Sequence, residues 1–301
     1  MASEFLGLEI LLAPGATLMK ITTGAIWSEG PVWMPKRKCL RWSDIPNNRI
    51  LEYFPDSGET KTYKNDVEFT NGRALDFDGS VVQCSHGLRR IERDLDGVVT
   101  SLIDSYQGVR LNSPNDVIVA SDGIVWFTDP PYGIQIAEEG HPGVREYEDC
   151  FVFRFDPKSK ELRPAVTDVE EPNGLAFSPD EKILYVSDTS CALRTDGSGN
   201  HHIRAYDVVE GRCKNGRTFA VINEGISDGF RVDLHGNVWT SSLIGVQVFN
   251  PKGEHLGIIP VPERVANVCF GGPSGQDLYI AATTSIYSIK TATKDAARTM
   301  K

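Results

Sequence analysis

The sequence predicts an all-β protein, a six-bladed β-propeller with four-stranded blades. Three observations lead to this fold class. Six short segments of similar sequence recur along the chain, each is followed by β-rich runs separated by turn residues, and no stretch has the length and apolar spacing of an amphipathic helix. A recurring unit of four short strands is typical of propellers, which arrange their sheets radially around a channel. Two β-sandwich domains would also use many short strands, but they do not explain six matched segments.

Each recurring segment opens near a Glu, Asn or Asp and continues into a short apolar run. The six openings are 28–33, 70–75, 114–119, 172–177, 227–232 and 266–270. We predict them as the innermost strands of the six blades.

Three further strands are predicted after each opening, as hairpin-like runs separated by turn residues. The second strands are 40–44, 81–85, 125–129, 184–188, 238–242 and 278–282. The third strands are 49–54, 88–93, 151–156, 203–208, 245–250 and 285–290. Fourth strands fit 59–63, 98–103, 161–166, 217–222 and 255–261. The sixth unit runs out of chain after its third strand, so we predict that residues 18–22 supply its outer strand and close the ring.

The chain is predicted to be a single propeller domain over residues 1–301. Two intervals between openings are wider than the others, and they indicate insertions rather than linkers. The longer insertion, about 130–149, is rich in Gly, Pro and Glu and lies between the second and third strands of the third blade. We expect it to form a mobile lid.

Composition limits the partners. The chain has 31 Lys and Arg against 41 Asp and Glu, a formal charge of −10, so nucleic acid and anionic membrane surfaces would be repelled. No run approaches the roughly 18 apolar residues of a membrane helix. The six cysteines are scattered without a Cys-x-x-Cys pair, which indicates reduced thiols in a cytoplasmic protein. We expect a small-molecule partner and a monomer or weak homodimer.

The openings place polar residues where the inner strands converge on one mouth of the channel. These residues are Glu29, Asn71, Asn115, Asn173, Asp228 and Asn267, called the ring residues below. Their oxygens suit a hard divalent cation, and Asn71 and Asn267 are the most readily explained as structural. His86 is a candidate for a hydrogen bond or a proton in the pocket, with a purely structural role as the alternative.

The Asp residues that end three second strands, Asp44, Asp129 and Asp188, favour turn capping over a role near the ion. No Gly-x-Ser-x-Gly elbow, phosphate-binding loop or dinucleotide fingerprint occurs in the required context, which disfavours those chemistries.

The segments that carry the repeat also hold a specific set of motifs. Five of them are Ser28-Glu29-Gly30-Pro31-Val32-Trp33, Ser113-Pro114-Asn115-Asp116, Asp129-Pro130-Pro131-Tyr132-Gly133, Pro172-Asn173-Gly174-Leu175-Ala176-Phe177 and Ser227-Asp228-Gly229, and a sixth is Cys84-Ser85-His86-Gly87 with Arg89-Arg90. The five resemble the SMP-30/gluconolactonase family, and the sixth extends the resemblance to its microbial gluconolactonase branch. The resemblance implies a propeller with one divalent ion held by Glu29, Asn173 and Asp228, and with Asn115 at the ion or on the substrate. Ser113 stands where the regucalcin branch has an arginine, so recognition of sugar hydroxyls is expected to differ.

Together, the ring and the resemblance predict metal-dependent hydrolysis of a sugar lactone, D-glucono-1,5-lactone or a related aldonolactone. Asp228 is the expected ligand and general base, with water on the ion as the alternative base, and Asn115, Asn173 and His86 are the expected substrate contacts. The expected cofactor is one divalent ion, with Ca²⁺ favoured over Mn²⁺, Mg²⁺, Zn²⁺ and Fe²⁺. The alternatives are a phosphotriesterase or arylesterase that uses the same ion, and a non-enzymatic calcium-binding propeller.

Overall fold

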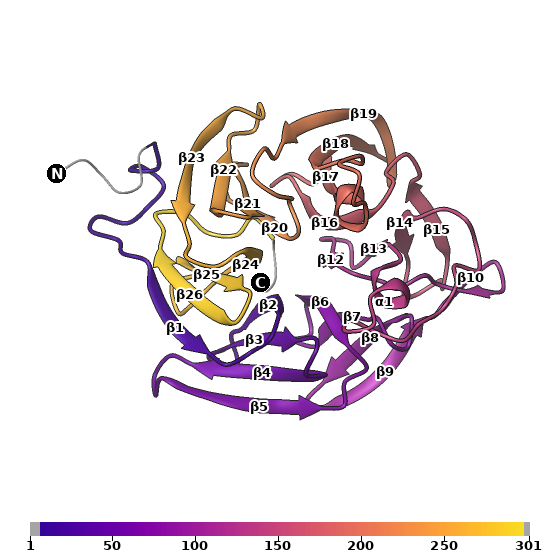
Figure 1. Ribbon diagram of the computed structural model, residues 1–301, viewed down its shortest axis with the longest axis horizontal. Helices are drawn as coiled ribbons and strands as arrows, with labels where there is room; N and C mark the ends of the chain where they lie inside the picture. Colours follow the sequence, from indigo (N-terminus) through magenta and orange to yellow (C-terminus); the bar gives the residue numbers. More distant parts are fainter. Residues whose placement is uncertain (1–6, 298–301) are drawn as a thin grey trace.

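Six four-stranded antiparallel sheets form one ring around a central channel (Figure 1). The structure, a computed structural model, describes residues 7–297. Five sheets are built from four consecutive strands, and the sixth combines the last three strands with the first strand of the chain. The predicted six-bladed propeller is confirmed, and the alternative of two β-sandwiches is wrong.

Within each blade the strands run from the channel outward. The innermost strands are β2 (Ser28–Met34), β6 (Thr70–Leu75), β12 (Val117–Val119), β16 (Pro172–Phe177), β20 (Phe230–Val232) and β24 (Val265–Gly271). The second strands are β3 (Cys39–Asp44), β7 (Val81–Ser85), β13 (Val125–Asp129), β17 (Ile183–Asp188), β21 (Val238–Ser242) and β25 (Asp277–Ala282). The third strands are β4 (Arg49–Phe54), β8 (Arg90–Leu95), β14 (Phe151–Phe155), β18 (His202–Val209), β22 (Gly245–Phe249) and β26 (Ser285–Lys290). The outer strands are β5 (Glu59–Asn65), β9 (Val98–Ile103), β15 (Leu162–Val166), β19 (Arg212–Val221), β23 (His255–Pro260) and β1 (Met19–Thr23).

Burial follows the position of a strand in its blade. Every residue of β3, β7, β13 and β21 is buried, whereas β5 and β19 are largely exposed. The core lies between neighbouring blades. For example, Trp126 and Val152 of the third blade belong to one apolar cluster with Leu175 and Leu184 of the fourth. Second strands are packed from both sides, which explains their nearly continuous apolar or small sequence.

The ring closes through the N-terminal strand. β1 pairs antiparallel with β26, with Met19 opposite Ser288 and Thr23 opposite Ser285 (Figure 1). Lys20 Nζ adds an ion pair to Glu263 Oε1 at 3.0 Å. Closure by an N-terminal strand was predicted over residues 18–22 and is confirmed, with the strand shifted by one residue.

Two inner strands begin later than predicted, because the residues before them pair irregularly with the second strands, through both backbone and side-chain hydrogen bonds. In the third blade Pro114 has no N–H, and the Asp116 N–H donates to Thr128 Oγ1 at 3.0 Å. In the fifth blade the Asp228 N–H donates to Ser241 Oγ at 2.8 Å. Regular pairing therefore starts only at β12 and β20, in each case two residues past the ring residue.

Four small elements were not predicted. The strands β10 (Ser105–Tyr106) and β11 (Val109–Arg110) pair as a hairpin. The helix α1 (Tyr132–Gln135) lies in the predicted insertion 130–149, and the 3-10 helix η1 (Ser190–Leu193) lies in the second wide interval. Both wide intervals are therefore insertions within a blade, as expected.

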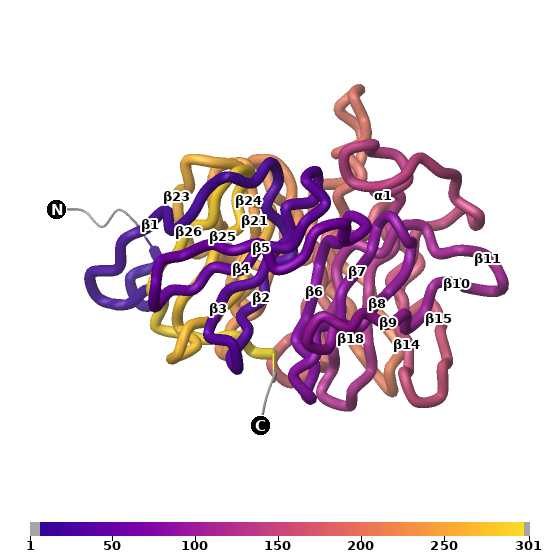
Figure 2. The backbone as a smooth tube through the Cα atoms, turned by 90° about the horizontal axis from the view of Figure 1, so that it is seen from below, coloured from indigo at the N-terminus to yellow at the C-terminus, as the bar shows by residue number. Residues whose placement is uncertain are grey.

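The two faces of the ring differ. α1 lies on one face, and the last described residues lie on the other (Figure 2). All six cysteines are free thiols. Within residues 7–297, no helix is long and apolar enough to cross a membrane.

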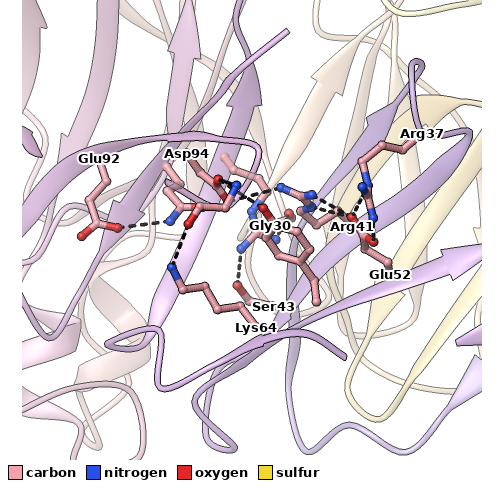
Figure 3. Close-up of polar contacts among 12 residues, drawn as sticks. Gly30, Arg37, Arg41, Ser43, Glu52, Lys64, Glu92 and Asp94 are labelled. Atoms are coloured by element: carbon pink, nitrogen blue, oxygen red, sulfur yellow. Dashed lines mark hydrogen bonds and ion pairs between the residues drawn. The ribbon is translucent and has the colours of Figure 1, made fainter. Parts of the chain in front are cut away.

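A buried network of charges joins the first two blades. Arg41 lies between Glu52 and Asp94, with Nη2 to Glu52 Oε1 at 2.7 Å and Nη1 to Asp94 Oδ2 at 3.4 Å (Figure 3). Arg73 lies nearby on β6, and its guanidinium donates to the carbonyl oxygen of Gly30 at 2.9 Å. Burial, and then the positive charge of Arg41, lower the pKa of Arg73 to about 9. The network thus holds the backbone directly after Glu29.

Candidate functional site

A cavity of about 270 Å³ occupies the channel mouth on the α1 face. Five of the six ring residues line it: Glu29, Asn71, Asn115, Asn173 and Asp228. The other wall residues are Trp27, Tyr132, Ile136, Glu139, Ala192, Leu193, Ile226 and Arg264. Residues from five blades, far apart in the sequence, therefore meet at one site, and both insertions contribute to its wall.

Irregular pairing aims the ring side chains at the cavity. The register between first and second strands shifts between Glu29 and Val32 in the first blade and between Pro172 and Leu175 in the fourth. A similar shift falls between Thr70 and Arg73. A bulge of this kind re-aims a side chain and ends regular pairing, as is common next to active sites.

Glycines that follow ring residues allow the blades to meet at the channel. The N–H of Gly72 donates to the carbonyl oxygen of Asn115 at 2.8 Å, and the N–H of Gly174 donates to that of Asp228 at 2.9 Å. A Cβ at Gly174 would overlap the Asp228 carbonyl oxygen, and one at Gly229 would overlap the side chain of Asn267. Glycine follows Asn or Asp in these segments because neighbouring inner strands contact each other too closely there for a Cβ atom.

Gly174→Ala is accordingly expected to displace Asp228 and Asn173 together. We expect a loss of about 1–3 kcal/mol in the free energy of unfolding from overpacking. Lactone turnover should fall by about 10²-fold, because a displacement of about 1 Å suffices for such a loss. The measurements are urea unfolding and kcat/KM. Gly108→Ala is the control, because its Cβ meets open space and its cost comes only from a φ of +86°. Equal activity in the two variants would contradict the role of Gly174.

Three aspartates at the ends of second strands hold the loops that lead into the ring. Asp44 Oδ1 accepts the N–H of Ile26 at 2.9 Å, and Asp129 Oδ2 accepts that of Asn112 at 2.8 Å. Asp188 Oδ2 accepts the N–H of Glu170 at 3.0 Å. Each donor lies three residues before a ring residue, namely Glu29, Asn115 and Asn173. The predicted capping role is confirmed, and it fixes the backbone that carries the site.

The carboxamides on the cavity wall are oriented by their nitrogen atoms. Asn71 Nδ2 donates to His86 Nε2 at 3.2 Å, with Asn115 Nδ2 at 3.5 Å from the same atom. Asn173 Nδ2 donates to Thr189 Oγ1 at 3.2 Å. Among residues 7–297 no donor meets the Oδ1 atoms of these three amides. Their oxygens are therefore left to face the cavity as acceptors.

Asn267 differs from the other ring amides, because both of its polar atoms are occupied. Its Nδ2 donates to Glu29 Oε2 at 3.0 Å, and its Oδ1 accepts the N–H of Val268 at 2.8 Å. It does not line the cavity, and its structure matches the structural role considered for it from the sequence.

The two ring carboxyl groups are buried near each other. Burial, reinforced by the negative charge of Asp228, raises the pKa of Glu29 well above its usual range. Burial also raises the pKa of Asp228 to about 6, although Arg264 and the Asn173 amide oppose the shift. A cation between these carboxyl groups would reverse both shifts.

The donor set of the ring fits a hard divalent ion. Among residues 7–297 no three His, Cys, Asp or Glu side chains cluster in a way that would hold a metal, so any such site depends on amide oxygens. The cavity wall supplies them through Asn115 and Asn173, beside Glu29 and Asp228. Carboxylate and carbonyl oxygens are the ligands of Ca²⁺, which takes about six to eight of them, with water completing the shell.

His86 lies behind the cavity wall and is fully buried. Its Nδ1 donates to the carbonyl oxygen of Glu139 at 3.0 Å, so Nε2 is the acceptor for the amides of Asn71 and Asn115. Burial lowers the pKa of His86 to about 4, which keeps its imidazole neutral at pH 7. The structure thus connects His86 to Asn115, another predicted substrate contact, but does not place it among the lining residues.

Ser113, which stands in place of the regucalcin arginine, is likewise not among the residues that line the cavity. Its hydroxyl donates to the carbonyl oxygen of Pro130 at 2.6 Å and accepts the N–H of Gly133 at 3.0 Å. It therefore anchors the start of the insertion.

Sequence reasoning missed Trp27, Tyr132, Glu139 and Arg264. Trp27 and Arg264 precede ring residues by two and three positions, so the repeat register carried a signal for them. The Arg264 guanidinium lies 5.2 Å from the centre of the Trp27 ring. Glu139 had no such signal, because it comes from an insertion that occurs in one blade only.

A larger cavity of about 420 Å³ lies at the other end of the channel, where residues 294–297 form part of the wall. Its wall is mainly apolar and includes Val32, Val119, Phe177 and Phe270. A site for chemistry needs convergent polar groups, and the smaller cavity supplies them.

The fold and the cavity together define a propeller with a polar, oxygen-lined site at one mouth of its channel. The chain belongs to the family described as the SMP-30/Gluconolactonase/LRE-like region, which matches residues 27–284. The resemblance noted in the repeat motifs is therefore confirmed.

Individual relatives support the same assignment. A gluconolactonase of Zymomonas mobilis is 31% identical over 95% of this chain and 84% of its own length. A pentonolactonase of Haloferax volcanii is 30% identical over 86% of this chain and 82% of its own. The solved structure of a gluconolactonase from Xanthomonas campestris superposes with a TM-score of 0.87 at 38% identity, covering 95% of this chain and 93% of that one.

Proposed function

We propose that the chain hydrolyses an aldonolactone, such as D-glucono-1,5-lactone, to the aldonic acid with the help of one divalent ion. The observation that carries the proposal is the cavity wall, where two buried carboxyl groups and free amide oxygens face the same space. Family membership and the gluconolactonase and pentonolactonase activities named for the relatives support the same reaction.

Glu29, Asn173 and Asp228 are the proposed ligands of the ion. When bound, the ion supplies Lewis-acid polarisation of the lactone carbonyl group. Asp228 is also proposed to accept a proton from the attacking water at its carboxylate. Ca²⁺ is the ion we favour, because the proposed ligands are all oxygens.

The remaining wall residues are proposed to bind the sugar. The free oxygen of Asn115 would accept a hydrogen bond from a hydroxyl group of the sugar, and His86 would contribute by holding the Asn115 amide in position. Trp27, Leu193 and Ile226 provide apolar surface for the C–H groups of the ring. A cytoplasmic protein that acts as a monomer or weak dimer remains part of the proposal, since six free thiols suit a reducing compartment.

Acid release by a pH indicator, above the spontaneous rate, tests the proposal in the presence of Ca²⁺. Four substrates should be compared: D-glucono-1,5-lactone, a pentono-1,4-lactone, phenyl acetate and paraoxon. We expect kcat/KM to be highest for an aldonolactone, because only the polyol uses the polar wall. Faster cleavage of phenyl acetate or paraoxon would replace the proposal by the esterase or phosphotriesterase alternative. No turnover of any substrate, combined with tight Ca²⁺ binding, would favour a calcium-binding propeller.

A further inference from the structure

Glu139 belongs to the insertion between β13 and β14, and its side chain lines the same cavity as Glu29, Asn173 and Asp228. Its backbone is held at two points. The carbonyl oxygen accepts Nδ1–H of His86 at 3.0 Å, and the N–H donates to the carbonyl oxygen of Ile136 at 3.1 Å. The histidine that orients Asn71 and Asn115 therefore also fixes the position of Glu139.

The insertion that carries Glu139 is anchored on both sides of it. The Tyr132 hydroxyl is 2.5 Å from Thr189 Oγ1, in the neighbouring blade. His141 Nε2 is 2.9 Å from Glu68 Oε2, and a Cβ at Gly140 would overlap the carbonyl oxygen of Gly133. Glu139 thus lies on a segment folded tightly onto the channel mouth, which suits a group that must be held in position.

The carboxyl group of Glu139 has no hydrogen-bond partner in the described part of the chain. Nδ1 of the neutral His86 ring lies 4.0 Å from its Oε2. The side chain keeps 24% of its surface exposed. Burial, and then the negative charge of Asp228, raise the pKa of Glu139 to about 7, while Arg264 opposes the shift. Burial is the largest of these causes and does not depend on the charge of Asp228, and the carboxyl group is not committed to any structural contact.

We propose that Glu139 is the general acid that protonates the ring oxygen of the lactone as the ring opens, an inference that rests on the proposed lactone hydrolysis. Water adds to the carbonyl carbon and gives one proton to the base. The bond between that carbon and the ring oxygen then breaks, and the ring oxygen takes a proton from the Glu139 carboxyl group. The base then releases its proton to solvent, and solvent returns a proton to Glu139. The net reaction converts lactone and water to the aldonic acid.

The other wall residues are less suited to this step. Glu29 and Asp228 are the proposed ligands of the ion. The Tyr132 hydroxyl is bonded to Thr189, and its pKa is raised well above the usual range by burial. The Arg264 guanidinium does not release a proton near neutral pH. Among the described residues of the wall, Glu139 is therefore the group with a carboxyl group that lies outside the proposed ligand set and has no hydrogen-bond partner.

Glu139→Gln tests the proposal, because glutamine keeps the size of the side chain but cannot donate an acidic proton. We expect kcat for D-glucono-1,5-lactone to fall by about 10²-fold or more, with KM changed by less than about threefold. In the unaltered protein kcat should fall as the pH rises through the pKa of the acid, because only the protonated form donates. This basic limb should be absent from the variant. The charged or titratable groups that face Glu139 are Asp228, Arg264, His86 and Glu138, and all of them remain in the variant.

Glu138→Gln is the matched control, since it removes the same charge from the adjacent, exposed residue. It should keep kcat, and its basic limb should move only slightly to lower pH, because the charge of Glu138 raises the pKa of Glu139 less than burial and the charge of Asp228 do. Ca²⁺ affinity by calorimetry should be the same in both variants and the parent, and loss of Ca²⁺ binding in Glu139→Gln would overturn the proposal by making Glu139 a ligand. Parental kcat with a parental pH profile in Glu139→Gln would also overturn it. Absence of turnover in the parent itself would instead remove the proposed function, and this inference with it.

Discussion

Asp228→Asn is expected to lower kcat/KM for D-glucono-1,5-lactone by about 10³-fold or more and to leave the propeller folded. The loss follows because the change removes both a proposed ligand charge and the proposed base, and stabilisation by an ion is worth several kcal/mol, or about tenfold per 1.4 kcal/mol. The fold should persist because the contacts of this residue with Ser241 and Gly174 use its backbone atoms.

The same substitution should not lower the stability of the metal-free protein. Burial raises the pKa of Asp228 to about 6, so ionisation of this carboxyl group opposes folding when no cation is present. Steady-state kinetics checks the loss of kcat/KM, and thermal unfolding in a chelator checks the stability of the metal-free protein. Asp96→Asn, at an exposed hairpin turn, is the control and should retain full activity. Activity within about tenfold of the parent in a folded Asp228→Asn protein would remove Asp228 from the mechanism.

Removal of divalent ions is expected to abolish turnover above the spontaneous rate and to lower the thermal midpoint. Restoring an ion at about 100 times its dissociation constant should contribute about 2.7 kcal/mol to the free energy of unfolding. For a chain of 301 residues, that corresponds to roughly 4 °C in the midpoint. The stabilisation arises because the ion neutralises Glu29 and Asp228, whose raised pKa values show that their charges are poorly compensated without it.

The measurement is a lactonase assay and a thermal scan after chelation, repeated with Ca²⁺, Mn²⁺, Mg²⁺ or Zn²⁺. Glu29→Gln is the control, because it removes one proposed ligand and should reduce the thermal shift with every ion. A chelated protein that turns over lactone at the full rate would contradict metal dependence. A large thermal shift without turnover would instead support the calcium-binding alternative.

The strands and ring residues that were predicted correctly from the sequence share one physical reason. Each blade repeats the same packing problem, so the opening motifs fixed the inner strands, and the second strands 81–85, 125–129 and 238–242 were predicted with their observed bounds. Glu29, Asn115, Asn173 and Asp228 were placed together for the same reason, since equivalent positions of a radial repeat converge on one mouth.

The errors in the prediction have local causes. β12 and β20 were predicted too long, because the residues before them pair irregularly. The hydroxyl groups of Thr128 and Ser241 accept backbone N–H groups there beside the remaining backbone bonds, and no propensity rule expresses this. The hairpin of β10 and β11 and the helix α1 are too short to have a periodic signal.

The sequence by itself determined the number of blades, the closing strand and the set of ring residues, because all three follow from a pattern that repeats along the chain. Only the tertiary structure decided which ring amides have free oxygens, since this depends on His86, Thr189 and Glu29, partners brought in from other segments. It alone also placed Glu139 on the wall. A residue in an unrepeated insertion has no register, so its position is set by how that segment packs onto the rest of the ring.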